Sequence, residues 1–497
     1  MVPEAGEAIA EIIAALEPVC SRWRGQVSDR LRATLGRVLP SSVTGLLRGL
    51  AAEHEALAGG DGRTVPQAAQ RALQPAGTAL VRAAWRLQGH AELPPPEQRP
   101  CCAKCGGRSK LVRAHQSLRR IGRFGAYELE RPYYTCEHCG GGYSPGDAAW
   151  GLGAGGLDPD LQELVARDGV ESAFEEASKA ILSHLQVRLD DNTVQRDTVA
   201  IGLVALDRIA ERAASDTCRL GPDPGSDIMV LEVDGGRVEA GGRWRESKVA
   251  VAGPLGPELV VDERTGREHL RAGPMRYAAD IGDADGFFAR QVRQLAEDAG
   301  LYHPRVRCVT LLGDGGGWIE NRWAGLTLPA QVQVFDILDL RHFEEHVWDA
   351  AKACWGEGSA QTKAWAETQI TEVLNKGPEP LLKLLPDLQP DTDRGRDEMR
   401  KLQGYVADNA HRLRYPEFIA LKLPIASGAI EAGVRIVNNE RVKNSCMHWS
   451  VPGARAVLAL RAIALSGRES WDRFWATNPQ LTRPTARELG TLRAKVA

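Results

Sequence analysis

The sequence lacks three features that would define its class directly: a long apolar run, a strong net charge and abundant cysteine. None of its 497 residues belongs to a run of the roughly twenty apolar residues that a membrane helix needs. The 62 lysines and arginines nearly balance the 65 aspartates and glutamates, so the net charge of −3 does not by itself indicate a nucleic-acid partner. Glu4, Glu7 and Glu11 occupy a region that is basic in signal peptides. We therefore expect a cytoplasmic protein with no membrane partner.

Cysteine is scarce, with ten residues in the chain, but four of the cysteines form two close pairs. Cys102 with Cys105, and Cys136 with Cys139, make two CxxC motifs that are each followed by two glycines. In a reducing compartment such pairs indicate a metal site, and two CxxC turns can present four thiolates to one tetrahedral Zn²⁺. Cys101 directly precedes Cys102, so either residue could be the first ligand. A closed four-thiolate shell is structural, and we predict a structural zinc module.

Hydrophobic spacing changes several times along the chain and predicts a multidomain α/β protein. Helical periodicity gives way to alternating strands around the cysteines, then returns in two stretches separated by a turn, which Asp191 or Asn192 could cap. That is the outline of a helix-turn-helix. We predict an N-terminal helical region at 1–95, a zinc-binding module at 100–150, a helix-turn-helix-like region at 158–220, the first part of a core at 226–355, an all-helical insertion at 356–423, and C-terminal helices that complete the core at 424–497.

The segment from residue 226 onward has the pattern of a mixed-sheet core. Three apolar stretches are predicted to form consecutive strands, and a helix, a strand, a short helix, another strand and a long helix follow them. A three-strand meander followed by helix, strand, helix and strand is the order of an RNase H-like fold. We therefore predict an RNase H-like core that the helical insertion interrupts.

Two aspartates follow apolar runs within this core. Asp234 follows MVLEV and precedes two glycines, and Asp314 follows CVTLLG and precedes three. An ionised carboxylate at the end of a buried strand carries a desolvation cost unless a cation or a donor compensates it. On neighbouring strands the two aspartates would face each other, and a divalent metal ion would relieve their repulsion. For either residue alone, a turn-forming role is the alternative.

A third carboxylate is expected from a helix that packs beside those strands. Glu431 is our choice, because it lies on a helix rich in bases where Arg435 could contact a phosphate. Glu440 is the alternative, and we expect it to pair with nearby arginines instead. Asp339 and His342 form a DxxH motif at the end of the next strand. Asp339 either caps the following helix, with His342 in its first turn, or one or both side chains support the metal ligands.

Several segments carry a resemblance to a known family. The segments that carry the resemblance are LEVDGG, LLGDGGGWIENRW, ILDLRHFEEH and the stretch from SGAIEAGVRIVNNERVKNSC to ARAVLALR. In these segments the chain resembles bacterial insertion-sequence transposases of the ISKra type, which belong to the DDE transposases. The cysteine region that ends in RPYYTCEHCGGGYSPGD is also similar, apart from its Cys101–Cys102 doublet. The resemblance covers roughly residues 100–475, and its carboxyl-terminal motif is the most specific part.

The resemblance implies a transposase that cleaves DNA strands and transfers them to a target, in the nucleoid of a bacterial cell. Asp234, Asp314 and Glu431 would hold Mg²⁺ or Mn²⁺, and Asp339 with His342 would match a feature shared with Mutator-like relatives. The partners would be terminal inverted repeats and target DNA, bound by a homodimer or larger assembly. The side chains that we expect to contact DNA are Arg119, Arg120, Arg123, Arg196, Arg435, Arg441 and Lys443.

Two other functions fit parts of the sequence. A stand-alone RNase H-like nuclease, such as a structure-specific resolvase, would cut DNA without joining it. A zinc-ribbon regulator would bind DNA without chemistry, and it would leave the strand-end aspartates unexplained.

Overall fold

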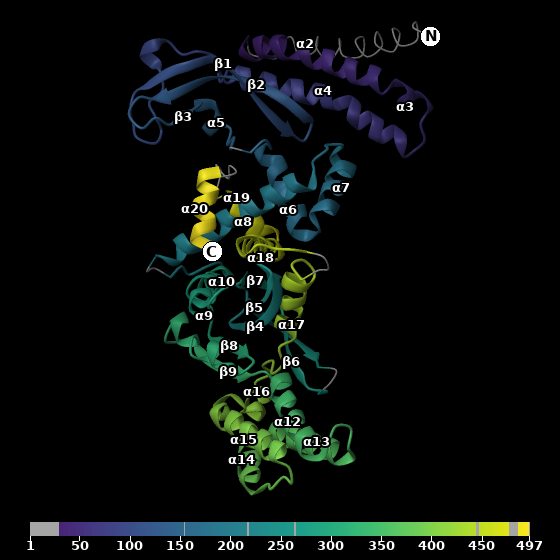
Figure 1. The fold of residues 1–497 in the computed structure, drawn as a ribbon, viewed down its shortest axis with the longest axis vertical. Coiled ribbons are helices and arrows are strands. Elements are labelled where there is room, and N and C mark those ends of the chain that lie inside the picture. Colours follow the sequence, from purple (N-terminus) through teal and green to yellow (C-terminus); the bar gives the residue numbers. More distant parts are fainter. Residues whose placement is uncertain are drawn as a thin grey trace. The chain divides into compact units, whose positions relative to one another are not determined.

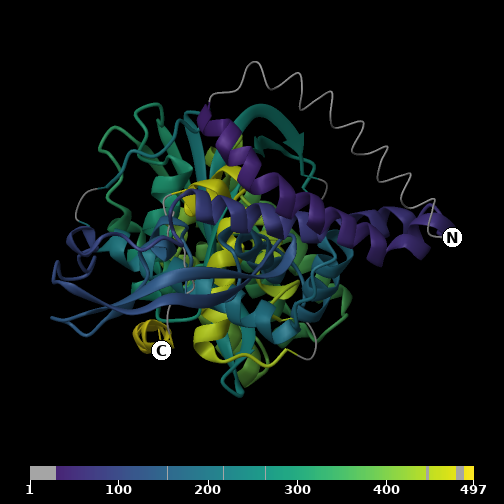
Figure 2. The same cartoon turned by 90° about the horizontal axis from the view of Figure 1, so that it is seen from above.

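The computed structural model describes residues 29–153, 155–215, 218–262, 265–443, 447–476 and 486–496. These residues form two compact units (Figure 1). Figure 2 shows the same ribbon from above. The first unit holds residues 29–198 with 486–489, and the second holds 199–476 with 490–496, so the division falls within one long helix. Helices and mixed sheets together confirm the prediction of a mixed α/β protein.

The first unit begins with two long helices, α2 and α4, that lie against each other (Figure 1). Glycine is required at their contact, because a Cβ atom at Gly49 would lie 1.9 Å from the carbonyl oxygen of Ala72. Helix α4 also packs on the sheet that follows it, where the buried Trp85 donates from Nε1 to the carbonyl of Glu130 at 2.9 Å. The elements here are α2 (Asp29–Ala52), α3 (His54–Gly59), α4 (Thr64–Leu87) and the 3₁₀ turn η1 (Pro96–Gln98).

A long antiparallel hairpin carries the cysteine pairs. We predicted short strands here, but the structure has strands of 14 and 12 residues that turn between Gly122 and Gly125. The register pairs Ser109 with Cys136, so the start of the first strand lies beside the end of the second strand at the open end of the hairpin. A two-residue strand extends the sheet in the order β1-β2-β3. The elements are β1 (Ser109–Gly122), β2 (Gly125–Cys136), β3 (Gly142–Tyr143) and α5 (Pro145–Ala149).

Three helices follow, and the last two are joined by the predicted turn. The turn begins at Gln186, whose φ of 56° ends the first of these two helices in the left-handed region. Asp190 accepts a hydrogen bond from the backbone N–H of Thr193 at 2.7 Å. The capping residue is therefore Asp190, and our choice of Asp191 or Asn192 was wrong, because the helix already begins at Asp191. The helices are α6 (Pro159–Glu171), α7 (Phe174–Leu185) and α8 (Asp191–Ala213).

The second unit is built on a six-stranded sheet in the order β6-β5-β4-β8-β9, with β7 also paired to β5. β4 is antiparallel to β5 and parallel to β8, and β8 is parallel to β9. We did not predict β6 from the sequence. It pairs with the C-terminal part of β5, whereas β7 pairs with the middle of β5. The strands are β4 (Ile228–Ala240), β5 (Arg243–Val261), β6 (Glu268–Ala272), β7 (Arg276–Asp280), β8 (Cys308–Gly313) and β9 (Gln333–Leu338).

The two faces of the sheet bury different sets of helices, because successive residues of a strand point to opposite sides. Leu311 packs in a cluster with residues of α9, η2 and α10, whereas Leu312 packs in a cluster with residues of α12. The elements of the first face are α9 (Ala284–Phe287), the π-helical turn η2 (Phe288–Val292), α10 (Arg293–Ala299), α11 (Gly317–Glu320) and η3 (Trp323–Leu326).

The predicted helical insertion is helical, and it packs with α12 in one apolar cluster (Figure 1). After it, α17 contacts β4 and β5, where a Cβ at Gly433 would lie 2.8 Å from Val251. No helix among the described residues is both long and apolar enough to span a membrane. The remaining elements are α12 (Leu340–Trp355), α13 (Ala360–Lys376), α14 (Glu379–Leu384), η4 (Leu385–Asp387), α15 (Asp393–Asp408), η5 (Ala410–Arg412), α16 (Tyr415–Ala420), α17 (Gly428–Gly433), the π-helical turn η6 (Val434–Asn439), α18 (Val451–Leu465), α19 (Arg468–Ala476) and α20 (Ala486–Val496).

Candidate metal centres

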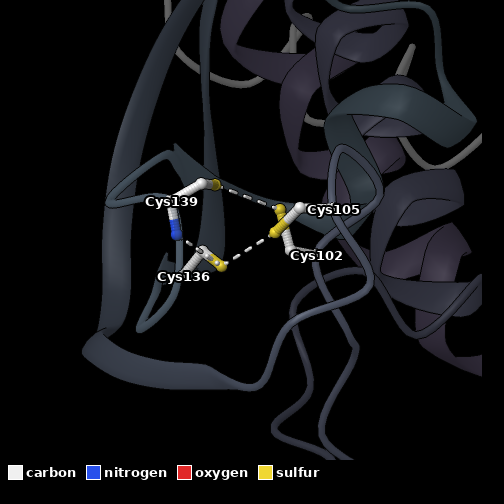
Figure 3. A group of neighbouring side chains, drawn as sticks. All are labelled: Cys102, Cys105, Cys136 and Cys139. Carbon is white, nitrogen blue, oxygen red and sulfur yellow. Dashed lines mark hydrogen bonds between the residues drawn. The ribbon is translucent and has the colours of Figure 1, made fainter.

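The four paired cysteines converge at the open end of the β1–β2 hairpin. Their sulfur atoms all lie within 4.8 Å of one another, so the group can hold one metal ion (Figure 3). Cys105 and Cys136 approach to 3.4 Å between sulfurs, and Cys102 and Cys139 to 3.8 Å. Cys101 is exposed and lies outside the group, so among the described residues the structure selects Cys102 as the first ligand.

Both CxxC motifs form the same turn. The N–H of Gly106 donates to the carbonyl of Cys102 at 2.8 Å, and Gly140 donates to Cys136 in the same way at 3.0 Å. Both glycines have φ near +70°, which side-chain-bearing residues rarely adopt, and this explains the glycine after each pair. The N–H of Cys139 donates to the sulfur of Cys136 at 3.5 Å and is the main cause that lowers the pKa of this thiol to about 6. This hydrogen bond therefore favours the metal-binding thiolate form of Cys136.

A second group of metal-binding type lies where β4, β8 and β9 run side by side. Val233 pairs with Gly313, and Gly313 pairs with Leu338, so Asp234 on β4 lies level with Asp314 and Asp339, which directly follow β8 and β9. Oxygen atoms of Asp234 and Asp314 and a ring nitrogen of His342 lie within 4.8 Å of one another. The structure thus brings together two of the predicted ligands and one of the two residues of the DxxH motif.

We predicted that Asp234 ends its strand, and this prediction was wrong. β4 continues to Ala240, because it forms a hairpin with β5 that extends beyond the end of β8. Burial is the main cause that raises the pKa of Asp234 to about 6, and the nearby charges of Asp314 and Asp339 add to the effect. The N–H of Gly235, which donates to Asp234 at 2.6 Å, opposes the shift. A cation at this position would stabilise the ionised carboxylate.

Asp339 fulfils the helix-capping role that its motif suggested. Its buried carboxylate caps α12 by accepting from the N–H of Arg341 at 3.3 Å. It also accepts from the N–H and the hydroxyl of Ser427, at 3.0 and 2.7 Å. Ser427 directly precedes α17, so Asp339 fixes the start of the helix that carries Glu431.

Glu232 is a site residue that our sequence analysis missed. It lies on β4 two residues before Asp234, on the same face of the strand, and it is buried. Its carboxylate accepts from the N–H of Ile430 at 2.8 Å, and so holds the first turn of α17. Burial is the main cause that raises its pKa to about 8, and the charges of Asp339 and Glu431 contribute. The alternation of two acids in LEVD was the available signal.

The raised pKa of Glu232 predicts a pH-dependent stability. Folding favours the protonated form, so this group destabilises the fold as pH rises from its ordinary pKa of 4.5 to about 8, and the loss is complete above that value. We expect Glu232→Gln, which stays neutral, to be more stable than the wild type at pH 8 by on the order of 2 kcal/mol. Chemical denaturation at pH 4.5 and pH 8 would measure this. The exposed Glu258→Gln is the control, and equal stability of Glu232→Gln and the wild type at both pH values would contradict the interpretation.

Glu431 is not a member of the group formed by Asp234, Asp314 and His342, although it lies nearby. Its carboxylate pairs with the guanidinium of Arg341 at 2.7 Å, and its side chain is 38% exposed. Its charge acts on Glu232, as does that of Asp234, so all three carboxylates gather on one face of the sheet. Glu440 lies within 4.0 Å of Arg435 and Arg461, as we expected of it.

Two of the arginines that we predicted to contact DNA are buried. Arg120 is 1% exposed, pairs with Asp158 at 3.2 Å, and donates to the carbonyls of Gly153, Gly155 and Leu157, so it holds a loop instead. Arg441 is also 1% exposed and lies over the ring of Trp449, and burial lowers its pKa to about 10. Neither side chain can reach a phosphate in this structure. The other predicted residues, which are exposed, are Arg119, Arg123, Arg196, Arg435 and Lys443.

Loss of the buried Arg120 side chain should destabilise the first unit. Arg120→Ala would remove a donor from three carbonyls and the charged partner of Asp158, which would keep the hydrogen bond from the hydroxyl of Tyr127. We expect a loss of roughly 3–5 kcal/mol in the free energy of unfolding. Arg123→Ala is a matched control, because Arg123 pairs with Asp160 while 48% exposed. Urea denaturation would compare them, and equal stability of the two variants would show that Arg120 does not hold the loop.

A groove of about 750 Å³ lies along α2 and α4 in the first unit. Its lining includes the exposed side chains of Arg48, Arg82 and Arg86, together with Thr78 and Glu92. Three positive charges against one negative charge give this groove an attraction for anions.

Comparison with known families and proteins gives no assignment. No family model matches the chain, and no curated protein sequence matches it. The two groups that could hold a metal ion therefore carry the functional information in this structure.

Proposed function

We propose that this protein is a DDE-type DNA transposase that cleaves and joins DNA with metal ions held at Asp234 and Asp314 and, during the reaction, at Glu431. The observation that carries the proposal is the approach of Asp234, Asp314 and His342 to within 4.8 Å. Both aspartates are partly buried, and two carboxylates that approach this closely repel each other unless a cation joins them. Their placement is therefore better explained by metal binding than by turn formation.

The strand order supports an RNase H-like interpretation of the second unit. The order β7-β5-β4-β8-β9, with β5 antiparallel to its neighbours and the others parallel, is the arrangement expected from a meander followed by crossover strands. In this arrangement the central strand β4 and its neighbour β8 supply one aspartate each. The helix that follows the insertion then supplies a carboxylate to the same face.

The donor atoms fit Mg²⁺ or Mn²⁺. Carboxylate oxygens are the ligands that Mg²⁺ prefers, and the ring nitrogen of His342 adds a ligand type that Mn²⁺ accepts more readily. Bound ions would activate water or a DNA 3′-hydroxyl and stabilise the leaving oxygen. Asp234 and Asp314 would hold the ions, while Asp339 and Glu232 fix the start of α17, the helix from which Glu431 would join them.

The first unit supplies the proposed recognition of DNA. The terminal inverted repeats would be bound by its four-cysteine group, by α7 with the first part of α8, and by the exposed arginines Arg119, Arg123 and Arg196. Arg435 and Lys443 are exposed in the second unit and would contact phosphates nearer the cut. Pairing two DNA ends requires two active sites, so we propose a dimer or larger assembly on DNA.

A strand-transfer assay tests the proposal. The purified chain is incubated with a pre-cut element end, a target plasmid and either Mg²⁺ or Mn²⁺, and joined products are counted. We expect joining that depends on the metal and is abolished by chelation. Cleavage without joining would instead indicate the stand-alone nuclease. Binding without either reaction would indicate the regulator.

A further inference from the structure

Arg341 occupies a position that neither the metal-binding group nor the helix caps explain. It lies in the first turn of α12 between Asp339 and His342, two residues of the proposed site. Its side chain is 52% exposed, and its guanidinium lies 2.7 Å from the carboxylate of Glu431. One positive charge thus lies at the edge of a group of acids.

The Arg341–Glu431 pair is exchangeable on physical grounds. Both side chains are more than one-third exposed, and ion pairs of this kind contribute little to stability. Each partner has a stronger alternative, because a carboxylate binds a divalent cation and a guanidinium binds a phosphate through two parallel hydrogen bonds. A pair of low stability with two such alternatives can separate when both arrive.

The pair is also not needed to place α17. Asp339 already holds Ser427 through two hydrogen bonds, and Glu232 holds the N–H of Ile430. These contacts are buried, whereas the Arg341 contact is not. A purely structural role for Arg341 would therefore duplicate contacts that are stronger.

We propose that Arg341 binds the DNA phosphate next to the cut, and that it exchanges Glu431 for this phosphate as Glu431 turns to the metal. The proposal deepens the proposed function and depends on it. The exchange would couple the completion of the metal site to the arrival of DNA, because Glu431 is released more readily when Arg341 gains another anion.

The test compares Arg341→Gln and Arg341→Lys with the control Lys352→Gln. Lys352 lies on the same helix and also pairs with an acid, Asp349, at 3.2 Å. Calorimetry measures Mn²⁺ binding to the full chain without DNA, and a salt series measures binding to an element-end duplex. For Arg341→Gln we expect Mn²⁺ to bind about 3- to 10-fold more tightly, because a competing charge is lost. We also expect the salt slope of DNA binding to fall by about one unit, and cleavage at saturating DNA to fall about 10- to 100-fold.

The opposite signs of these effects distinguish the proposal from a structural role. For Arg341→Lys we expect wild-type Mn²⁺ affinity but reduced cleavage, because lysine keeps the charge and loses the paired hydrogen bonds. Weaker Mn²⁺ binding by Arg341→Gln, or an unchanged salt slope, would overturn the proposal. If Arg341→Gln fails to fold, wild-type cleavage by Arg341→Lys would overturn it. Mn²⁺ binding that is lost in Asp234→Asn but unaffected by Arg341→Gln would overturn only this inference and leave the proposed metal centre intact.

Discussion

Replacing Asp234 or Asp314 with asparagine is expected to abolish DNA cleavage and joining while the protein still folds and binds DNA. Asparagine has the same shape but no charge, and a metal ion shared by two carboxylates loses most of its attraction when one is neutral. We expect the rate to fall by about 10³-fold or more, which corresponds to about 4 kcal/mol of transition-state stabilisation. Because burial raises the pKa of Asp234 to about 6, Asp234→Asn should not destabilise the fold near neutral pH.

The matched control for these variants is Asp349→Asn. Asp349 is an exposed aspartate of α12 that pairs with Lys352. Cleavage and strand transfer are measured for all three variants on the same pre-cut end, and DNA affinity is measured separately by fluorescence anisotropy. Wild-type cleavage by Asp234→Asn would remove the metal centre from the mechanism and favour the regulator. Equal losses of cleavage and of DNA affinity would indicate a folding defect instead.

The second large effect is expected at the four-cysteine group. If the group holds zinc as predicted, Cys102→Ser or Cys136→Ser should release one zinc ion per chain and unfold the open end of the β1–β2 hairpin, because a metal ion there would join the two turns. Structural zinc contributes roughly 10–16 kcal/mol in small domains, far more than the other contacts of these turns. Recognition of the element end should be lost with it. Zinc content by atomic absorption and thermal unfolding by circular dichroism measure the two effects.

Cys101→Ser provides a control from the neighbouring residue. Cys101 is exposed and outside the group, so its variant should keep zinc and wild-type stability. The reverse pattern, in which Cys101→Ser loses zinc and Cys102→Ser keeps it, would show that the first ligand has been assigned wrongly. Retention of zinc by both Cys102→Ser and Cys136→Ser would contradict the site itself.

Local features of this protein were predictable from the sequence, because they depend on short spacings. Two CxxC motifs followed by glycines predict two metal-binding turns, whatever the fold that brings the turns together. The apolar runs before Asp234 and Asp314 predicted buried strands that carry acids, and both strands are present. The order of strands and helices in the second unit was also correct, apart from the added strand β6 and the greater length of β5.

Burial and partner choice were not predictable, because they depend on contacts between residues far apart in the chain. Arg120 and Arg441 belong to basic stretches that look exposed, yet the tertiary structure buries both. Glu232 looks like an ordinary strand residue until Ile430, almost two hundred residues later, donates to it.

The sequence by itself determined which residues are able to bind metal ions and which strands carry them. Only the tertiary structure decided that His342 approaches the two aspartates and that Glu431 pairs with Arg341. The reason is that ligand type is a property of each side chain, whereas distance and desolvation depend on the packing of the whole unit.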